Sequence, residues 1–129
     1  VIYTPLMGSS DYSADALKSA VGMRAALAEF NASGKFAVPV NFGIGIHSGR
    51  LVAGNIGTFS RLEYTFIGDT VNIASRLQSK TKDHGTDIIV SGAALAKARG
   101  SLGGSMAFES LGMAALKGKS EAVELFKVL

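Results

Sequence analysis

The sequence contains no cysteine, only two prolines and two histidines, and no long apolar run. Without cysteine, the chain has no disulfide scaffold, no thiolate nucleophile and no zinc site built on sulfur. The scarcity of proline and the irregular spacing of sixteen glycines exclude collagen-like and low-complexity sequence. No stretch approaches the roughly 20 apolar residues of a membrane-spanning helix, and the first residues lack a signal-peptide pattern. We therefore expect a soluble chain, with a cytoplasmic location favoured.

The chain also lacks a large excess of charge of one sign. Its net charge is only +3, and the basic residues are scattered along the sequence. Domains that bind nucleic acid gather basic residues into runs or faces, so no nucleic-acid partner is expected. Small ligands that carry phosphate remain compatible with this charge. A length of 129 residues with 47% hydrophobic residues is typical of one globular domain. The sequence thus predicts a single domain over residues 1–129.

The first half of the chain shows a helical and then an alternating pattern. Apolar residues recur at steps of four and three over 11–32, which predicts an amphipathic helix. An alternating run over 38–46 and an apolar run over 51–56 are predicted to pair as a hairpin with a short turn. Gly43 and Gly45 leave one face of the first strand bare, so another backbone or a ligand should lie close to it.

The second half continues the mixture of strands and helices. An alternating strand over 62–67 precedes a predicted helix over 70–82, for which Asp69 is the expected N-cap. The later patterns predict a strand over 86–90, a helix from Ser91 to Arg99, and strands over 107–113 and 121–128. Helices packed on a sheet that contains antiparallel pairs define the α+β class.

Two short motifs and the two histidines do not carry a function. Residues 43–49 resemble a dinucleotide fingerprint, but the last glycine comes one residue late and a hairpin is expected to follow. Residues 118–120 echo a phosphate loop, but Met113 stands where that loop needs glycine. His47 and His84 lie on different elements without carboxylates at ligand spacing, so no metal or triad role is assigned to them.

The most informative segment covers residues 64–77. Asn72 and Arg76 lie four residues apart on the predicted helix, so they share one face. The arginine offers a planar fork that suits phosphate, and the asparagine can hold a neighbouring oxygen atom. This pair is competent to position a phosphoester. Spacing alone leaves open the alternative of two solvated polar residues on a surface helix.

Two longer runs carry a family resemblance. Gly-Ile-His-Ser-Gly-Arg-Leu-Val-Ala-Gly-Asn-Ile-Gly covers 45–57, and Tyr-Thr-Phe-Ile-Gly-Asp-Thr-Val-Asn-Ile-Ala-Ser-Arg-Leu covers 64–77. Together they resemble the catalytic domain of class III adenylyl and guanylyl cyclases, and pieces near both ends of the chain follow in the same order. The resemblance implies a ferredoxin-like, palm-type α+β fold. It also implies a homodimer whose active site, between two subunits, turns a nucleoside triphosphate into a cyclic monophosphate and pyrophosphate.

The resemblance also implies roles for individual residues. Asn72 would orient the ribose and the α-phosphate, and Arg76 would stabilise the transition state. Thr65 stands at the position that reads the purine edge, where threonine marks a subgroup often stimulated by bicarbonate. Because a hydroxyl can accept from the adenine amino group, ATP is favoured, although GTP is compatible with the donor. Phe66 and Ile67 would contribute to the base pocket.

Two basic residues match positions that contact phosphate in the family. Lys117 corresponds to the first lysine of a Lys-Gly-Lys turn, which contacts the triphosphate. Arg50 corresponds to an arginine that reaches phosphate from the partner chain. Exposed basic residues beside turns are commonly just solvated, so this alternative stays open for both.

The resemblance has one large gap. The first strand and the hairpin that carry the metal-binding aspartates would lie upstream of Val1, so no residue here is assigned to the expected two Mg²⁺ or Mn²⁺ ions. This chain alone is therefore predicted to be inactive. The main hypothesis is an adenylyl cyclase; the alternatives are a catalytically dead cyclase homology module for dimerisation or regulation, and a guanylyl cyclase. Membrane tethering of a longer protein stays open.

Overall fold

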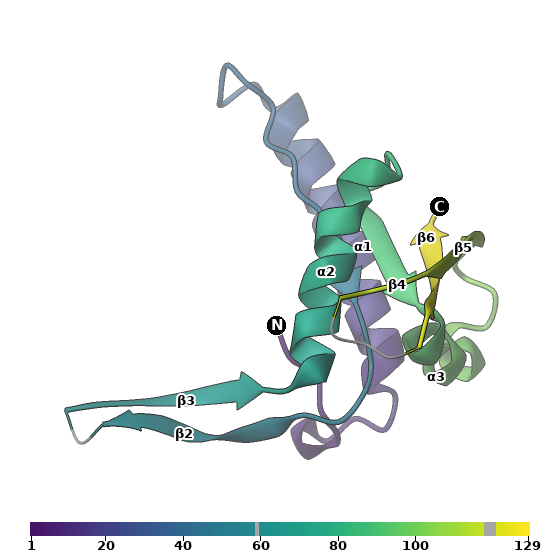
Figure 1. The fold of residues 1–129 in the computed structure, drawn as a ribbon. Helices are drawn as coiled ribbons and strands as arrows, with labels where there is room; N and C mark the ends of the chain where they lie inside the picture. Colours follow the sequence, from purple (N-terminus) through teal and green to yellow (C-terminus); the bar gives the residue numbers. More distant parts are fainter. Residues whose placement is uncertain (59, 118–120) are drawn as a thin grey trace.

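A computed structural model describes residues 1–58, 60–117 and 121–129. Its central feature is a four-stranded sheet in the order β1-β4-β6-β5. The first pair is parallel and the other two pairs are antiparallel. A second, two-stranded sheet pairs β2 with β3 (Figure 1). In chain order the elements are η1 (Pro5–Met7), α1 (Tyr12–Ala32), β1 (Ile44–Ile46), β2 (Val52–Thr58), β3 (Arg61–Ile67), α2 (Asp69–Asp83), β4 (Ile88–Ser91), α3 (Gly92–Leu102), β5 (Phe108–Ala114) and β6 (Val123–Val128).

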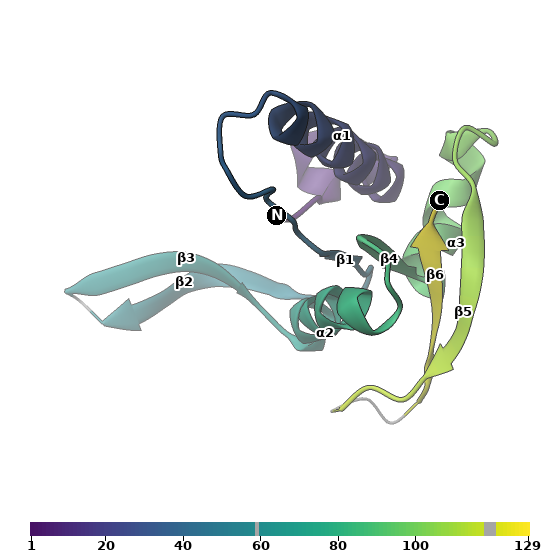
Figure 2. The same ribbon diagram turned by 90° about the horizontal axis from the view of Figure 1, so that it is seen from above.

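Helices cover both faces of the four-stranded sheet. The side chains of β4 alternate, so that Ile88 and Val90 join one buried cluster and Ile89 joins the other. The first cluster contains residues of α1 and α3, and the second contains residues of α2. Figure 2 shows this division, with α2 on the opposite side of the sheet from α1 and α3. The predicted α+β class is confirmed.

The helices begin and end for local reasons. The hydroxyl of Ser91 accepts a hydrogen bond from the Ala94 amide at 3.3 Å, which confirms Ser91 as the N-cap of α3. Gly103 ends that helix in the left-handed conformation, later than the predicted end at Arg99. Helix α1 matches its predicted range within one residue. Among the described residues, no helix combines the length and apolar character needed to cross a membrane.

Helix α2 differs from its prediction at the N-terminus. Gly68, with a positive φ of 142° that favours glycine, occupies the N-cap, and Asp69 is the first helical residue. The prediction of Asp69 as N-cap is therefore wrong, although an acidic residue in the first turn still interacts favourably with the helix dipole. The most deeply buried positions of α2 are Ile73, Leu77 and Thr81, each one turn after the last.

The predicted hairpin between residues 38–46 and 51–56 is wrong. Only Ile44–Ile46 forms a strand, and it pairs in parallel with β4. Residues 38–43 alternate in sequence but pair with no strand in the described part of the chain, and the Asn31 side chain instead forms hydrogen bonds of 2.8 and 2.9 Å with the Val40 backbone. Strand pairing is a long-range choice that a local alternating pattern does not decide.

The hairpin that does form joins β2 to β3. We call it the arm, residues 52–67. It is antiparallel from Val52↔Ile67 to Thr58↔Arg61, and it extends away from the rest of the chain in both views (Figures 1 and 2). The arm is joined to β1 by residues 47–51, which we call the crossover segment. This segment carries the chain out of the four-stranded sheet.

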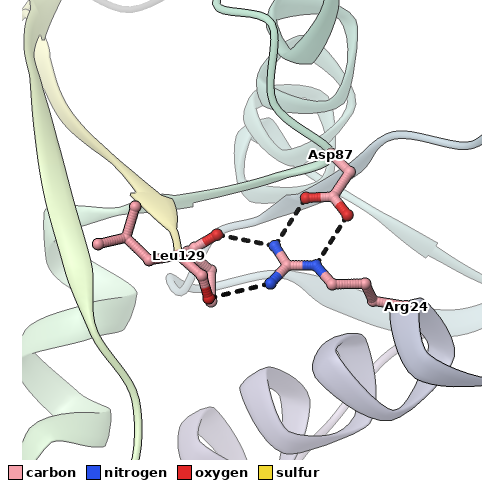
Figure 3. Close-up of polar contacts among 4 residues, drawn as sticks. Arg24, Asp87 and Leu129 are labelled. Carbon is pink, nitrogen blue, oxygen red and sulfur yellow. Dashed lines mark hydrogen bonds and ion pairs between the residues drawn. The ribbon is translucent and has the colours of Figure 1, made fainter.

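A polar cluster around Arg24 ties α1 to the end of the sheet (Figure 3). The Arg24 guanidinium donates to both carboxylate oxygens of Asp87, at 2.7 and 2.6 Å. It also donates to the carbonyl oxygens of Val128 and Leu129, at 2.7 and 3.1 Å. One side chain thus connects a helix, the segment before β4 and the C-terminal strand.

Candidate functional site

Helix α2 presents the predicted pair Asn72 and Arg76 one turn apart. Asn72 is exposed and Arg76 is half-buried. The Nη1 atom of Arg76 is buried and has no hydrogen-bond partner among the residues that the structure describes. Buried polar groups are almost always paired, because an unpaired one retains the full penalty of its desolvation. A guanidinium in this state is available to an anionic ligand.

The position of α2 depends on a close approach to β1. A Cβ added to Gly45 would overlap the Ala74 carbonyl oxygen and the Gln78 amide nitrogen, and would lie 2.9 Å from the Leu77 carbonyl carbon. The expectation that a backbone or a ligand lies against this bare strand is confirmed, and it is the backbone of α2. The helix that carries Asn72 and Arg76 is therefore seated directly on the sheet.

Three other predicted site residues lie where the arm meets α2. Phe66 is half-buried and Ile67 is 48% exposed at the end of β3, just before the helix begins. Arg50 is exposed in the crossover segment, and its carbonyl oxygen accepts a hydrogen bond from the hydroxyl of Thr70 in the first turn of α2. The structure thus brings Arg50, Phe66 and Ile67 to the start of the helix that carries the pair.

The two remaining predicted residues are placed by the backbone. Thr65 lies on β3 opposite Gly54 of β2, and its side chain lies outside what the structure describes. Lys117 is exposed and follows Leu116, which is buried in the same cluster as Ile73 of α2. The lysine therefore leaves the core beside that helix. The rest of its predicted turn, residues 118–120, lies outside the described residues.

A cavity of about 510 Å³ lies beside β1 between the two helix layers. Its walls include Ala16 and Ala20 of α1, Ile44 and Ile46 of β1, and Ala74 and Gln78 of α2. In the described sheet, β1 is an edge strand, with β4 on one side only. The cavity therefore continues the plane of the sheet, between helices that cover its opposite faces.

Metal ligands are not gathered in the described part of the chain. Over residues 1–58, 60–117 and 121–129, no three His, Cys, Asp or Glu side chains come close enough to hold an ion. The described residues therefore provide no cluster of three such ligands for a Mg²⁺ or Mn²⁺ ion. We assign no step of a reaction to a metal ion held by this chain.

Sequence reasoning missed several polar contacts around the crossover segment. His47 was considered only as a metal ligand or triad member, yet its Nδ1 atom lies 2.8 Å from the buried Ser91 hydroxyl. The bond from Thr70 to the Arg50 carbonyl joins residues 20 positions apart. A Cβ on Gly49 would lie 2.5 Å from the Thr70 hydroxyl oxygen, so the glycine at this position is a sequence signal of the close approach.

Comparison with known proteins identifies a family. Residues 2–128 match the sequence profile described as the adenylate and guanylate cyclase catalytic domain. The chain is 44% identical over 85 residues to adenylate cyclase 1 of Rhizobium meliloti, which covers 66% of this chain and 12% of the relative. It is 36% identical over 120 residues to an adenylate cyclase of Anabaena cylindrica, covering 88% and 24%. The chain thus spans a small part of these relatives.

Solved structures give the same result at the level of the fold. The guanylyl cyclase Cya2 has a TM-score of 0.74 at 30% identity, covering 93% of this chain and 59% of that one. The adenylyl cyclase CyaB from P. aeruginosa has a TM-score of 0.64 at 26% identity, covering 88% and 55%. Proteins of both nucleotide specificities therefore resemble this fold.

Proposed function

Because the chain belongs to the family of adenylate and guanylate cyclase catalytic domains, we propose that it is the nucleotide-binding part of an adenylyl cyclase. The reaction converts ATP to 3',5'-cyclic AMP and pyrophosphate. The observation that carries this proposal is the buried Nη1 atom of Arg76, which has no hydrogen-bond partner among the described residues, one turn from Asn72 on a helix seated against the sheet. Such an atom is suited to an oxygen of the α-phosphate.

The chemistry needs little from the protein beyond positioning and charge. The ribose 3'-oxygen attacks the α-phosphorus, a new O3'–P bond forms, the bond to the departing pyrophosphate breaks, and the proton of the 3'-hydroxyl passes to solvent. Negative charge is spread over the phosphoryl oxygens in such a transition state. Arg76 stabilises that charge by preorganised hydrogen bonds. Asn72, one turn earlier, orients the ribose and the α-phosphate.

The remaining residues divide between the base and the phosphates. Thr65 reads the purine edge, since its hydroxyl can accept from the adenine amino group, with Phe66 and Ile67 beside it. Lys117 and Arg50 contact the phosphates, which suits their positive charge. Because threonine at this position marks a subgroup often stimulated by bicarbonate, we also expect bicarbonate to raise turnover. Adding bicarbonate to the assay tests this.

We propose a homodimer because the arm leaves apolar side chains exposed. A single two-stranded hairpin is marginally stable in water, and this one extends from the body with Val52 63% exposed and Ile67 48% exposed. A second copy of the chain would cover these apolar side chains. The nucleotide would then lie between the two subunits, with Arg50 reaching it from the partner copy.

The metal-binding part is proposed to come from outside these 129 residues. The cavity beside β1 continues the sheet and has helices above and below it, which is the environment of a further strand. The carboxylates that would hold two Mg²⁺ or Mn²⁺ ions belong to such a segment. This chain alone is accordingly expected to produce no cyclic nucleotide.

The test is turnover by the complete catalytic domain that carries this chain. We expect cyclic AMP from ATP with manganese, at a higher kcat/KM than cyclic GMP from GTP. Arg76→Ala should lower kcat by about 10²-fold or more, because it removes a transition-state donor. Arg99→Ala, an exposed arginine on α3, is the matched control and should leave kcat unchanged. Sedimentation should give the same dimer for both variants.

Two results would contradict this function, and a third would contradict the role of one residue. If the parent protein turned over neither nucleotide, the dead cyclase homology module would be the better description. A preference for GTP would instead make the protein a guanylyl cyclase. Unchanged kcat in Arg76→Ala would remove the assigned role of that residue while leaving the activity in place.

A further inference from the structure

We propose that Thr70 is a positioning residue that sets the arm relative to α2, and so sets the purine-reading strand relative to Asn72 and Arg76. This inference deepens the proposed function and rests on it for its catalytic consequence. Thr70 itself is placed outside the groups that contact the nucleotide. Its action is exerted through the backbone of the crossover segment.

The geometry of the arm's base carries the proposal. The chain leaves β1, passes through the crossover segment, runs out along β2, returns along β3 and enters α2 two residues later. The outgoing limb, which is the crossover segment, and the returning limb, which is residues 68–70, therefore meet at the first turn of α2. The Thr70 hydroxyl, on the returning limb, donates to the Arg50 carbonyl on the outgoing limb. One side chain thus closes the base of the arm.

Two glycines make room for this closure. A Cβ on Gly49 would lie 2.5 Å from the Thr70 hydroxyl oxygen and 3.4 Å from its methyl carbon. A Cβ on Gly68 would lie 3.5 Å from the Cα of Leu51, and its φ of 142° is strained for other residues. The backbones of both limbs therefore approach each other at the position where the Thr70 hydroxyl bonds.

The other end of the crossover segment is held by the main body. His47 Nδ1 lies 2.8 Å from the hydroxyl of Ser91, which is fully buried and caps α3. The Ser48 hydroxyl accepts from the Lys97 ammonium group at 3.1 Å. The segment is thus anchored near β4 and α3 at its start, and by Thr70 at its end. Loss of the Thr70 bond would therefore release this end of the segment from the first turn of α2.

The Thr70 bond affects the site through the orientation of β3. The arm protrudes from the body (Figure 1), so a rotation at its base turns β3 relative to α2, even at positions two residues from the base. Thr65 lies on that strand, whereas Asn72 and Arg76 lie on the helix beyond the base. Loosening the base changes the distance between the purine reader and the phosphate-binding pair. Discrimination between purines should be more sensitive to this change than overall stability.

The experiment compares Thr70→Val and Thr70→Ser in the complete catalytic domain. Valine retains the shape but removes the donor, and serine restores the donor. The matched control is Thr81→Val, because the Thr81 hydroxyl, also on α2, donates only to the local Gln78 carbonyl at 2.6 Å. We expect Thr70→Val to lower the ratio of kcat/KM for ATP over GTP by about fivefold, the effect of one net hydrogen bond. Thr70→Ser and Thr81→Val should keep the parent ratio.

A second readout does not depend on turnover. This chain has no cysteine of its own, so spin labels can be attached through Asn55→Cys on the arm and Ser79→Cys on α2, after replacement of any cysteine elsewhere in the protein. Both positions are exposed. Double electron–electron resonance, on dimers in which one protomer carries both labels and its partner carries none, should give one narrow distance in the parent. The distribution should be broader in Thr70→Val and narrow again in Thr70→Ser.

The outcomes separate this inference from the proposed function. If Thr70→Val keeps a narrow distance distribution, the inference is overturned, whatever the activity. An equal loss of turnover for ATP and GTP, or the same defect in Thr70→Ser, also overturns it. A parent protein that turns over neither nucleotide refutes the proposed function alone, and the distance distributions then decide whether Thr70 positions the arm.

Discussion

Replacement of Arg24 by methionine is the sharpest test of how the sheet and α1 are held together. Arg24→Met keeps the apolar stem of the side chain but removes four hydrogen bonds, two to Asp87 and two to carbonyl oxygens at the C-terminal strand. The residues joined are 63 to 105 positions apart in sequence. The variant therefore removes a long-range tie without opening a large cavity.

The magnitude follows from exposure. Arg24 is 27% exposed and Asp87 is 40% exposed, so solvent screens the ion pair and reduces it to about 0.5–1 kcal/mol. The bonds to the two carbonyl oxygens contribute about 1 kcal/mol each at most, and the one to Leu129 is exposed. The sum is about 2 kcal/mol, which lowers the melting temperature of a domain this size by roughly 8 °C.

The assay is urea denaturation of parent and variant, with the linear slope held common. Arg99→Met, at an exposed position on α3, is the control and should change the free energy of unfolding by less than about 0.5 kcal/mol. Arg24→Lys should be intermediate, because an ammonium group cannot reproduce the planar fork. The reasoning is refuted if Arg24→Met lies within the range of the control.

Two glycine substitutions should have opposite effects. Gly45→Ala should destabilise the chain by about 3 kcal/mol or more, because its Cβ would overlap the backbone of α2. The same variant should also lower nucleotide turnover, since α2 carries Asn72 and Arg76. Gly22→Ala should stabilise α1 by about 0.5–1 kcal/mol, because nothing lies within 4 Å of the added Cβ and alanine is the better helix former. Thermal melts check both, and equal effects of one sign would contradict the packing described around β1.

The helices were predictable because their signals are local. The apolar period of residues 11–32 and the serine at 91 determine α1 and the start of α3 without reference to distant parts of the chain. Asn72 and Arg76 share a helix face for the same local reason. The signals that failed were those that needed a partner strand, as in residues 38–43, where the sequence alternates but none of the described strands pairs with them.

The position and burial of the candidate site could not be predicted from such local signals. A sequence motif indicates which side chains can contact a phosphate, but the seating of α2 on β1 depends on Gly45 meeting a backbone some 30 residues later. The buried state of the Arg76 Nη1 atom is likewise a property of the packed helix. Sequence therefore predicted the chemical groups, and packing decided their exposure.

The amino-acid sequence by itself determined the class of fold, the helix that carries Asn72 and Arg76, and the family to which the chain belongs. These features depend on residue type and on spacing within one element. Only the tertiary structure decided that β1 pairs with β4, that the arm leaves the sheet, and that Thr70 and Arg24 join distant segments. Each of these depends on which backbone groups remain unpaired after the local elements form, and that is settled only when the whole chain packs.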